Sequence, residues 1–217
     1  MKKAIGIILF TVGLFAPRLT AAQGSLYVSN LGWTSTGSAA IGSDSWIAQS
    51  IITGTNSSGY VLNSVQLLMN AASGSPSGFN VSIYSSLSGL PYNNLGTLVG
   101  SDPAAGGLFT FTASDLDLSP STFYFVVVTA ATPVAQGAYI WSGENGPDSI
   151  GNQQWAIPDS YKSSPDGSSW TGHIRLNVPQ LGIYATAVPE PATVALAGLG
   201  LACLSLLRRR QWISMVC

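Results

Sequence analysis

Apolar and polar residues alternate with a period of two in several short segments of the chain. The clearest segments are 64–69, 79–84, 109–112 and 176–178. On a β-strand this period points one set of side chains inward and the other outward. A fifth segment, Phe123 to Val128, is apolar throughout, which is typical of a central strand that is covered on both faces.

Turn sequences rich in Gly, Pro and Ser separate these segments. The clearest are Ser57-Ser58-Gly59, Gly74 to Gly78, Ser88 to Pro91, Ala104 to Gly107 and Pro165-Asp166-Gly167. Short strands at such spacing predict an all-β sandwich or jelly roll with about nine strands. The segment Gly143 to Trp170 lacks periodicity and is expected to be a long loop region.

The N-terminus has a different pattern. Met1-Lys2-Lys3 precedes an apolar stretch from Ala4 to Ala16, and Thr20-Ala21-Ala22 supplies small residues. A positive segment, an apolar segment and a small-residue cleavage site are the parts of a secretory signal peptide. We therefore expect residues 1–22 to be a signal peptide that a signal peptidase removes after Ala22.

The C-terminus carries a second apolar segment. Val188-Pro189-Glu190-Pro191 is followed by residues 192–207, which have no charge, and then by Arg208-Arg209-Arg210. An apolar helix followed by cations is the order of a stop-transfer segment. Residues 192–207 would span about 24 Å as a helix, which is short for a bilayer core of about 30 Å. This length favours a temporary anchor in the inner membrane.

The segment 188–210 resembles the PEP-CTERM sorting signal of Gram-negative bacteria that produce exopolysaccharide, because the Val-Pro-Glu-Pro block, the short apolar helix and the arginine cluster occur in the required order. The resemblance implies that an exosortase, a membrane cysteine protease-transpeptidase, cuts near Pro189-Glu190-Pro191. It also implies an inner-membrane intermediate and then a place at the cell surface or in the extracellular matrix. Residues 211–217 depart from the family, whose members end soon after the basic cluster.

The part between the two ends, residues 23–187, is long enough for one domain with a core. Its only cations are Lys162 and Arg175 against eight acidic residues, so its net charge is near −6 (2 minus 8). This charge disfavours binding to nucleic acid but not to a neutral polysaccharide. Cys203 and Cys217 lie outside this part, so no disulfide is expected in it.

This middle part is similar to the choice-of-anchor ectodomains, type R in particular, which are found attached to surface-sorting tails. The resemblance rests on Trp46 to Ser50, Leu62 to Leu67, Phe79 to Tyr84, Ser88 to Pro91 and Leu118 to Tyr124. It implies a surface β-sandwich and supplies no catalytic residues.

Residues that could carry acid–base chemistry are few in residues 23–187. A hydrolytic triad needs a base, and His173 is the single histidine. Asp115 and Asp117 would share a face of a strand and are weak candidates for a carboxylate pair or a calcium site. Glu144 and Asp148 flank Gly146-Pro147, in a loop of a type that could also hold a cation. We expect no catalytic residues and no cofactor.

Aromatic residues in or next to the aperiodic region are the remaining indication of a ligand-binding surface. Trp141, Trp155, Tyr161 and Trp170 would stack on sugars if they were exposed, or fill the open ends of the core if they were not. The sequence therefore favours a non-catalytic surface or matrix protein associated with exopolysaccharide in a biofilm. The alternative is a secreted carbohydrate-active enzyme that uses a carboxylate pair.

Overall fold

The computed structural model describes residues 24–146, 149–175, 177–190 and 196. The predicted signal peptide, nearly all of the predicted membrane helix 192–207 and residues 208–217 lie outside these ranges. Among the described residues, no helix is long and apolar enough to cross a membrane.

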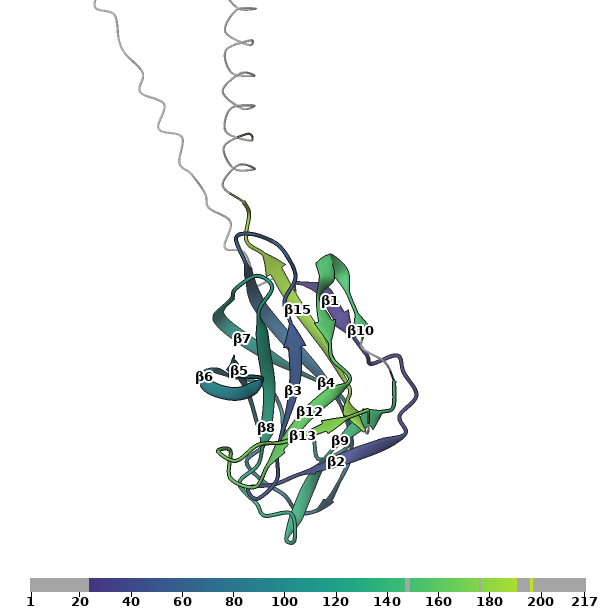
Figure 1. The fold of residues 1–217 in the computed structure, drawn as a ribbon. Coiled ribbons are helices and arrows are strands. Elements are labelled where there is room, and N and C mark those ends of the chain that lie inside the picture. Colours follow the sequence, from purple (N-terminus) through teal and green to yellow (C-terminus); the bar gives the residue numbers. More distant parts are fainter. Residues whose placement is uncertain (1–23, 147–148, 176, 191–195, 197–217) are drawn as a thin grey trace, which may run out of the picture.

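The body is all-β, and two antiparallel sheets pack face to face as a sandwich (Figure 1). The first sheet contains β1 (Ser25–Ser29), β15 (Leu181–Ala187), β4 (Tyr60–Gly74), β9 (Gly137–Glu144), β14 (Val178–Pro179), β2 (Gly37–Ile41) and β7 (Gly107–Leu118). The second contains β10 (Ser149–Ile150), β11 (Ala156–Ile157), β3 (Trp46–Ile52), β8 (Phe123–Thr129), β5 (Asn80–Leu87), β6 (Leu90–Leu98), β12 (Ser160–Ser164) and β13 (Thr171–Ile174). The predicted fold class is confirmed.

Strand β4 is the central strand of the first sheet. Its 15 residues make it longer than each of the strands that pair with it. On one side β15 pairs with Tyr60 to Leu67, and β9 takes over from Met69 to Gly74. On the other side β7 pairs with Tyr60 to Met69. The alternation predicted for residues 64–69 is seen here, with Val65, Leu67 and Met69 buried in the core.

In the second sheet, β8 lies between β3 and β5, as expected for an apolar strand covered on both faces. Val126 and Val128 face the core between the sheets, whereas Phe125 and Val127 belong to a separate apolar cluster on the outer face. Both sets are buried, which explains why no alternation is visible in the sequence of this strand.

The segment Gly143 to Trp170 is not the long loop region that the sequence predicted. It contains β10, the short 3₁₀ helix η1 (Asn152–Gln154), β11 and β12. Strands β11 and β12 pair with successive parts of β3 and so extend the second sheet. These strands have two to five residues, and β12 has the sequence Ser-Tyr-Lys-Ser-Ser, so an apolar period had no room to develop.

The two ends of the body leave from the same end of the sandwich (Figure 1). Antiparallel pairing causes this, because Ser25 at the start of β1 lies opposite Ala185 near the end of β15. The sorting segment therefore starts beside the point where the mature chain is expected to begin.

Candidate functional site

Two of the four aromatic residues predicted as a ligand surface are inaccessible. Trp141 and Trp155 are both 0% exposed, and this corrects the expectation that they could stack on a sugar. Trp141 lies on β9 between the sheets and donates its indole N–H to the carbonyl oxygen of Gln180 at 2.9 Å. Tyr161 is 9% exposed, and its ring stacks on that of His173 with centroids 4.6 Å apart. Of the four aromatic residues, Trp170 alone is partly exposed.

Trp155 belongs to an inner aromatic group, which we define as Tyr27, Tyr60 and Trp155. The ring centroids lie 5.0 to 5.3 Å apart, and Tyr60 meets both partners edge to face. The group joins β1 and β4 of the first sheet to the segment just before β11 of the second. These rings therefore hold the two sheets together at this end of the sandwich.

Trp170 belongs to an outer aromatic group on the other side of the second sheet. Ala48, Phe125 and Val127 form its buried floor, and the partly exposed rings of Trp46, Tyr84 and Trp170 pack against them. Strand register places Phe125 opposite Tyr84, and Ala48 opposite Val127. Trp170 was predicted as a surface residue from the sequence, but Trp46 and Tyr84 were not, because their outward direction depends on the register of β3 and β5.

The loop that brings Trp170 to this face is organised by Asp166. One carboxylate oxygen of Asp166 accepts hydrogen bonds from the Ser164 hydroxyl at 3.0 Å and from the amides of Ser168 and Ser169 at 2.8 and 2.9 Å. The Ser169 and Ser168 amides, together with the hydroxyls of Ser168 and Ser164, hold the pKa of the Asp166 carboxyl well below its usual value. These hydrogen bonds join both sides of the loop to one carboxylate and favour its charged form.

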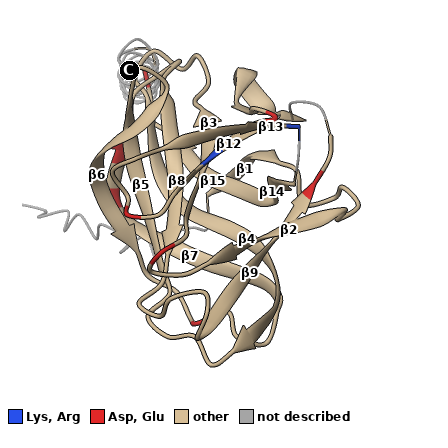
Figure 2. Ribbon diagram, turned by 60° about the horizontal axis from the view of Figure 1, so that its bottom comes forward, with Lys and Arg blue, Asp and Glu red and all other residues tan. Residues whose placement is uncertain are grey.

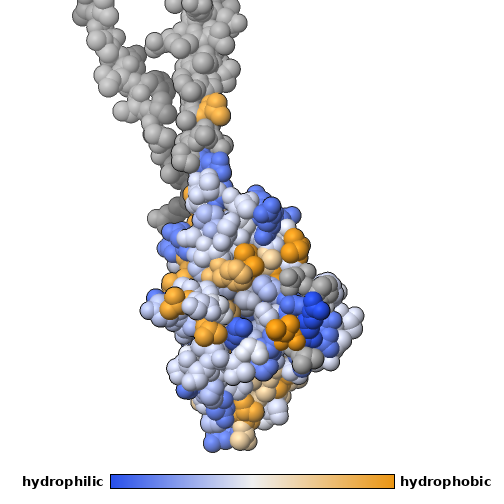
Figure 3. All heavy atoms as spheres, viewed as in Figure 1, coloured by the Kyte–Doolittle hydropathy of each residue, from blue (hydrophilic) through white to orange (hydrophobic). Residues whose placement is uncertain are grey.

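Polar groups border the outer aromatic group. The Ser82 hydroxyl lies 3.0 Å from the Thr97 hydroxyl and 3.0 Å from the side-chain oxygen of Asn80. Lys162 pairs with Ala48, so its side chain starts on the same face. The acidic residues are spread over the body (Figure 2), and separate apolar patches interrupt a mostly polar surface on the side shown in Figure 3.

Asp115 and Asp117 are both exposed near the end of β7. Asp115 has a φ of 50° and lies in the register shift between β4 and β7, whereas Asp117 lies in the regular pairing that resumes at Leu116. Within the described residues, no group of three metal-ligating side chains forms around them or elsewhere. Asp148 of the second weak pair lies outside the described residues.

Glu144, the other member of that pair, is buried at the end of β9, opposite Val178 of β14. It is 2% exposed, and one of its carboxylate oxygens has no hydrogen-bond partner within the described part of the chain. Burial raises the pKa of Glu144, a hydrogen bond from Asn30 opposes the rise, and the charge of Asp159 adds to it. The residue is thus a poorly solvated acid in the first sheet.

His173 has a hydroxyl partner that the sequence did not reveal. Its Nε2 atom lies 2.8 Å from the Ser163 hydroxyl, across the β12–β13 pair. Among the described residues, no carboxylate hydrogen-bonds to the imidazole ring. In the part of the chain that the structure describes, Ser163 and His173 thus form a pair, whereas a hydrolytic triad adds an acid that orients the base.

The predicted sorting motif begins in contact with the body. The Val188 amide donates to the carbonyl oxygen of Gly59 at 3.0 Å, and the Val188 carbonyl accepts from the Asn56 side-chain amide at 3.0 Å. The Ser57 hydroxyl donates to a Glu190 carboxylate oxygen at 2.9 Å. Pro191 and Arg208 to Arg210 lie outside the described residues.

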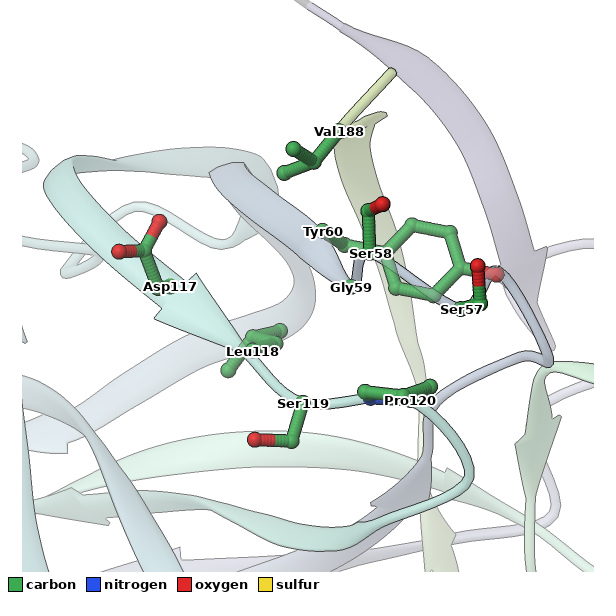
Figure 4. A pocket seen from close by; sticks show the side chains of 9 residues that line it. All are labelled: Ser57, Ser58, Gly59, Tyr60, Asp117, Leu118, Ser119, Pro120 and Val188. Carbon is green, nitrogen blue, oxygen red and sulfur yellow. The ribbon is translucent and has the colours of Figure 1, made fainter. Parts of the chain in front are cut away.

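A hollow of about 330 Å³ adjoins these contacts. Figure 4 shows Val188 and Pro120 on opposite sides of it, with Ser57, Ser58 and Tyr60 between them. Asp117 also lines the hollow, so one of the two predicted acids lies next to the sorting motif.

Comparison with known protein families supports the assignment of the sorting motif. Residues 187–210 match the family model of the PEP-CTERM protein-sorting motif. No curated protein and no solved structure matches the chain. The motif implies an exported protein that an exosortase sorts to the cell surface, and the described part of this protein is a two-sheet β-sandwich joined directly to that motif.

Proposed function

We propose that the exported body is a non-catalytic component of the cell surface or extracellular matrix of a Gram-negative bacterium, and that it associates with exopolysaccharide through the outer aromatic group. The observation that carries the proposal is the set of partly exposed rings of Trp46, Tyr84 and Trp170 over a buried apolar floor. Aromatic faces pack on the apolar faces of sugar rings, and nearby hydroxyl and amide groups bind sugar hydroxyls.

The expected affinity of one such face is low. Each ring would contribute on the order of 1 kcal/mol, which is weak for a single body in solution. Many bodies on one polysaccharide chain bind much more strongly than one, because each later contact forms at a high effective concentration. Weak and repeated contacts suit a protein that adheres to a matrix.

The charge of the body supports a neutral ligand in preference to an anionic one. Residues 23–187 carry two cations against eight acidic residues, so an acidic polymer would be repelled over most of the surface. Lys162 lies at the outer face itself and can donate to hydroxyl or carbonyl oxygens of a neutral chain.

The test is co-sedimentation of the body with exopolysaccharide purified from the strain that produces the protein. Trp170→Ala and Tyr84→Ala should each lower the bound fraction, while Trp33→Ala should not. Trp33 is a suitable control because it is also partly exposed, at 42%, and lies outside the outer aromatic group. Equal binding by the wild type and both outer-group variants would contradict the proposal.

The alternative, a secreted carbohydrate-active enzyme, needs two carboxylates about 5 to 10 Å apart that face one sugar. Its best pair remains Asp115 and Asp117. Release of reducing sugar from the same polysaccharide, abolished by Asp115→Asn or Asp117→Asn, would replace the non-catalytic proposal with this one.

A further inference from the structure

The sorting motif is held by the body over its first three residues. Val188 directly follows β15, and both of its backbone polar groups are hydrogen-bonded, to Gly59 and to Asn56. Pro189 has no N–H to satisfy, and Glu190 then binds the Ser57 hydroxyl. The contacts join residues that are 129 to 133 positions apart in the sequence.

The turn that holds the motif is itself anchored in the core. The Gly59 amide donates to the Asn56 carbonyl at 2.9 Å, and the Asn56 amide donates to the Tyr60 hydroxyl at 3.1 Å. Tyr60 is 1% exposed and belongs to the inner aromatic group. Gly59 has a φ of +80°, and a Cβ atom there would lie 2.6 Å from the Leu118 carbonyl oxygen. The turn therefore has a fixed shape before the tail binds.

We propose that Asn56, Ser57 and Gly59 form an intramolecular binding site for the start of the sorting motif, so that the folded body competes with the exosortase for Val188 and Glu190. The inference rests on the assignment of the tail as an exosortase substrate. Proteins commonly recognise extended peptides through main-chain hydrogen bonds, with side-chain contacts for specificity. Here the main-chain groups of Val188 and one carboxylate oxygen of Glu190 are already occupied, so the motif must leave the turn before it can be cut.

The most specific test of this binding site is Ser57→Ala. Ser57 is exposed, and its hydroxyl binds Glu190 without supporting the turn, so the substitution should remove only the contact with the tail. Pulse-chase labelling of the full chain in a strain with an active exosortase should show tail removal several-fold faster than in the wild type, up to about tenfold for the loss of one hydrogen bond. Ser57→Thr keeps the hydroxyl and should be processed at the wild-type rate. Ser101→Ala, in an exposed loop away from the turn, is the matched control and should also leave the rate unchanged.

A second measurement does not depend on processing. In the full chain purified in detergent from an exosortase-deficient strain, hydrogen exchange should show that the Val188 amide is protected. Ser57→Ala should reduce this protection, and Ser101→Ala should not.

Slower or unchanged processing of Ser57→Ala would overturn the proposal, since the contact would then present the motif or have no influence on it. An unprotected Val188 amide in the wild type would overturn it as well. If no variant and no wild-type chain is processed, the exosortase assignment fails, and the exchange measurement still decides whether the turn binds the tail.

Discussion

The inner and outer aromatic groups lie on the two sides of the second sheet. Both consist of tryptophan and tyrosine, but they differ in how much of each ring is exposed to solvent. In the inner group, Trp155 and Tyr60 are almost fully buried between the sheets. In the outer group, Trp46, Tyr84 and Trp170 cover a small apolar floor and keep part of their surface in solvent. A tryptophan in this protein is therefore either a core residue or a partly exposed surface residue, depending on whether a second sheet covers it.

The largest expected effect is on stability, from the inner group. Replacing Trp155 by Ala should lower the free energy of unfolding by about 3–5 kcal/mol, because a fully buried ring leaves a cavity. Urea denaturation of the body measures this. Trp155→Phe is the matched variant and should cost clearly less, since it retains a ring and removes an indole N–H that has no partner within the described residues. A small loss in the alanine variant would show that the inner group does not hold the sheets together.

A smaller effect is expected from Tyr60→Phe, which keeps the ring and removes the hydroxyl. That hydroxyl donates to Gln153 at 2.9 Å and accepts from the Asn56 amide at 3.1 Å. The loss should be about 1–2 kcal/mol for these hydrogen bonds, measured by urea denaturation. The same variant should increase exchange of the Val188 amide, because the Asn56–Gly59 turn loses its anchor. Unchanged exchange would mean that the turn does not depend on the inner group.

Trp170→Ala should affect binding to exopolysaccharide more than stability, in contrast to Trp155→Ala. The Trp170 ring is partly exposed on the outer face of one sheet, where its removal leaves no closed cavity, so we expect a loss of only about 1 kcal/mol in the free energy of unfolding, together with weaker co-sedimentation with exopolysaccharide. Thermal melting and binding are measured on the same preparation. A loss as large as that of Trp155→Ala with unchanged binding would remove the distinction between the two groups.

The smallest expected effect is a change in pH dependence. Burial and the neighbouring Tyr60 raise the pKa of Tyr27 above its ordinary value of 10.0, while a hydrogen bond with the Ala187 backbone opposes the rise. Above pH 10 the unfolded chain therefore loses a proton that the folded chain keeps, and the free energy of unfolding falls as the pH rises. In Tyr27→Phe this fall should be shallower, as measured by urea denaturation between about pH 9 and 11. It should not vanish, because burial also raises the pKa of Tyr139 and Tyr161. Identical slopes in variant and wild type would contradict the burial of the Tyr27 hydroxyl.

Local patterns in the sequence were sufficient for the fold class. Alternation in residues 64–69 and 109–112 marks β4 and β7, and the uniform apolar run marks β8, because each of these strands is long enough to show a period. The sorting motif was equally readable, since its recognition depends on the order of a Pro-Glu-Pro block, an apolar run and arginines along the chain. The short strands β10 to β12 were missed because their pairing with each other and with β3 sets their structure, and their own composition does not reveal it.

The positions of the aromatic side chains could not be read from the chain. Trp141, Trp155 and Trp170 come from the same stretch of sequence, and only the packing of β9 against its neighbours and the fold of the Asp166 loop separate the buried rings from the exposed one. The contact of Asn56 and Ser57 with the sorting motif could not be predicted from the sequence either. It forms only when β15 pairs with β4 and brings Val188 to the turn. Burial and long-range hydrogen bonds depend on which distant segments meet, so they belong to the tertiary structure, whereas strand periods and a sorting signal are properties of neighbouring residues.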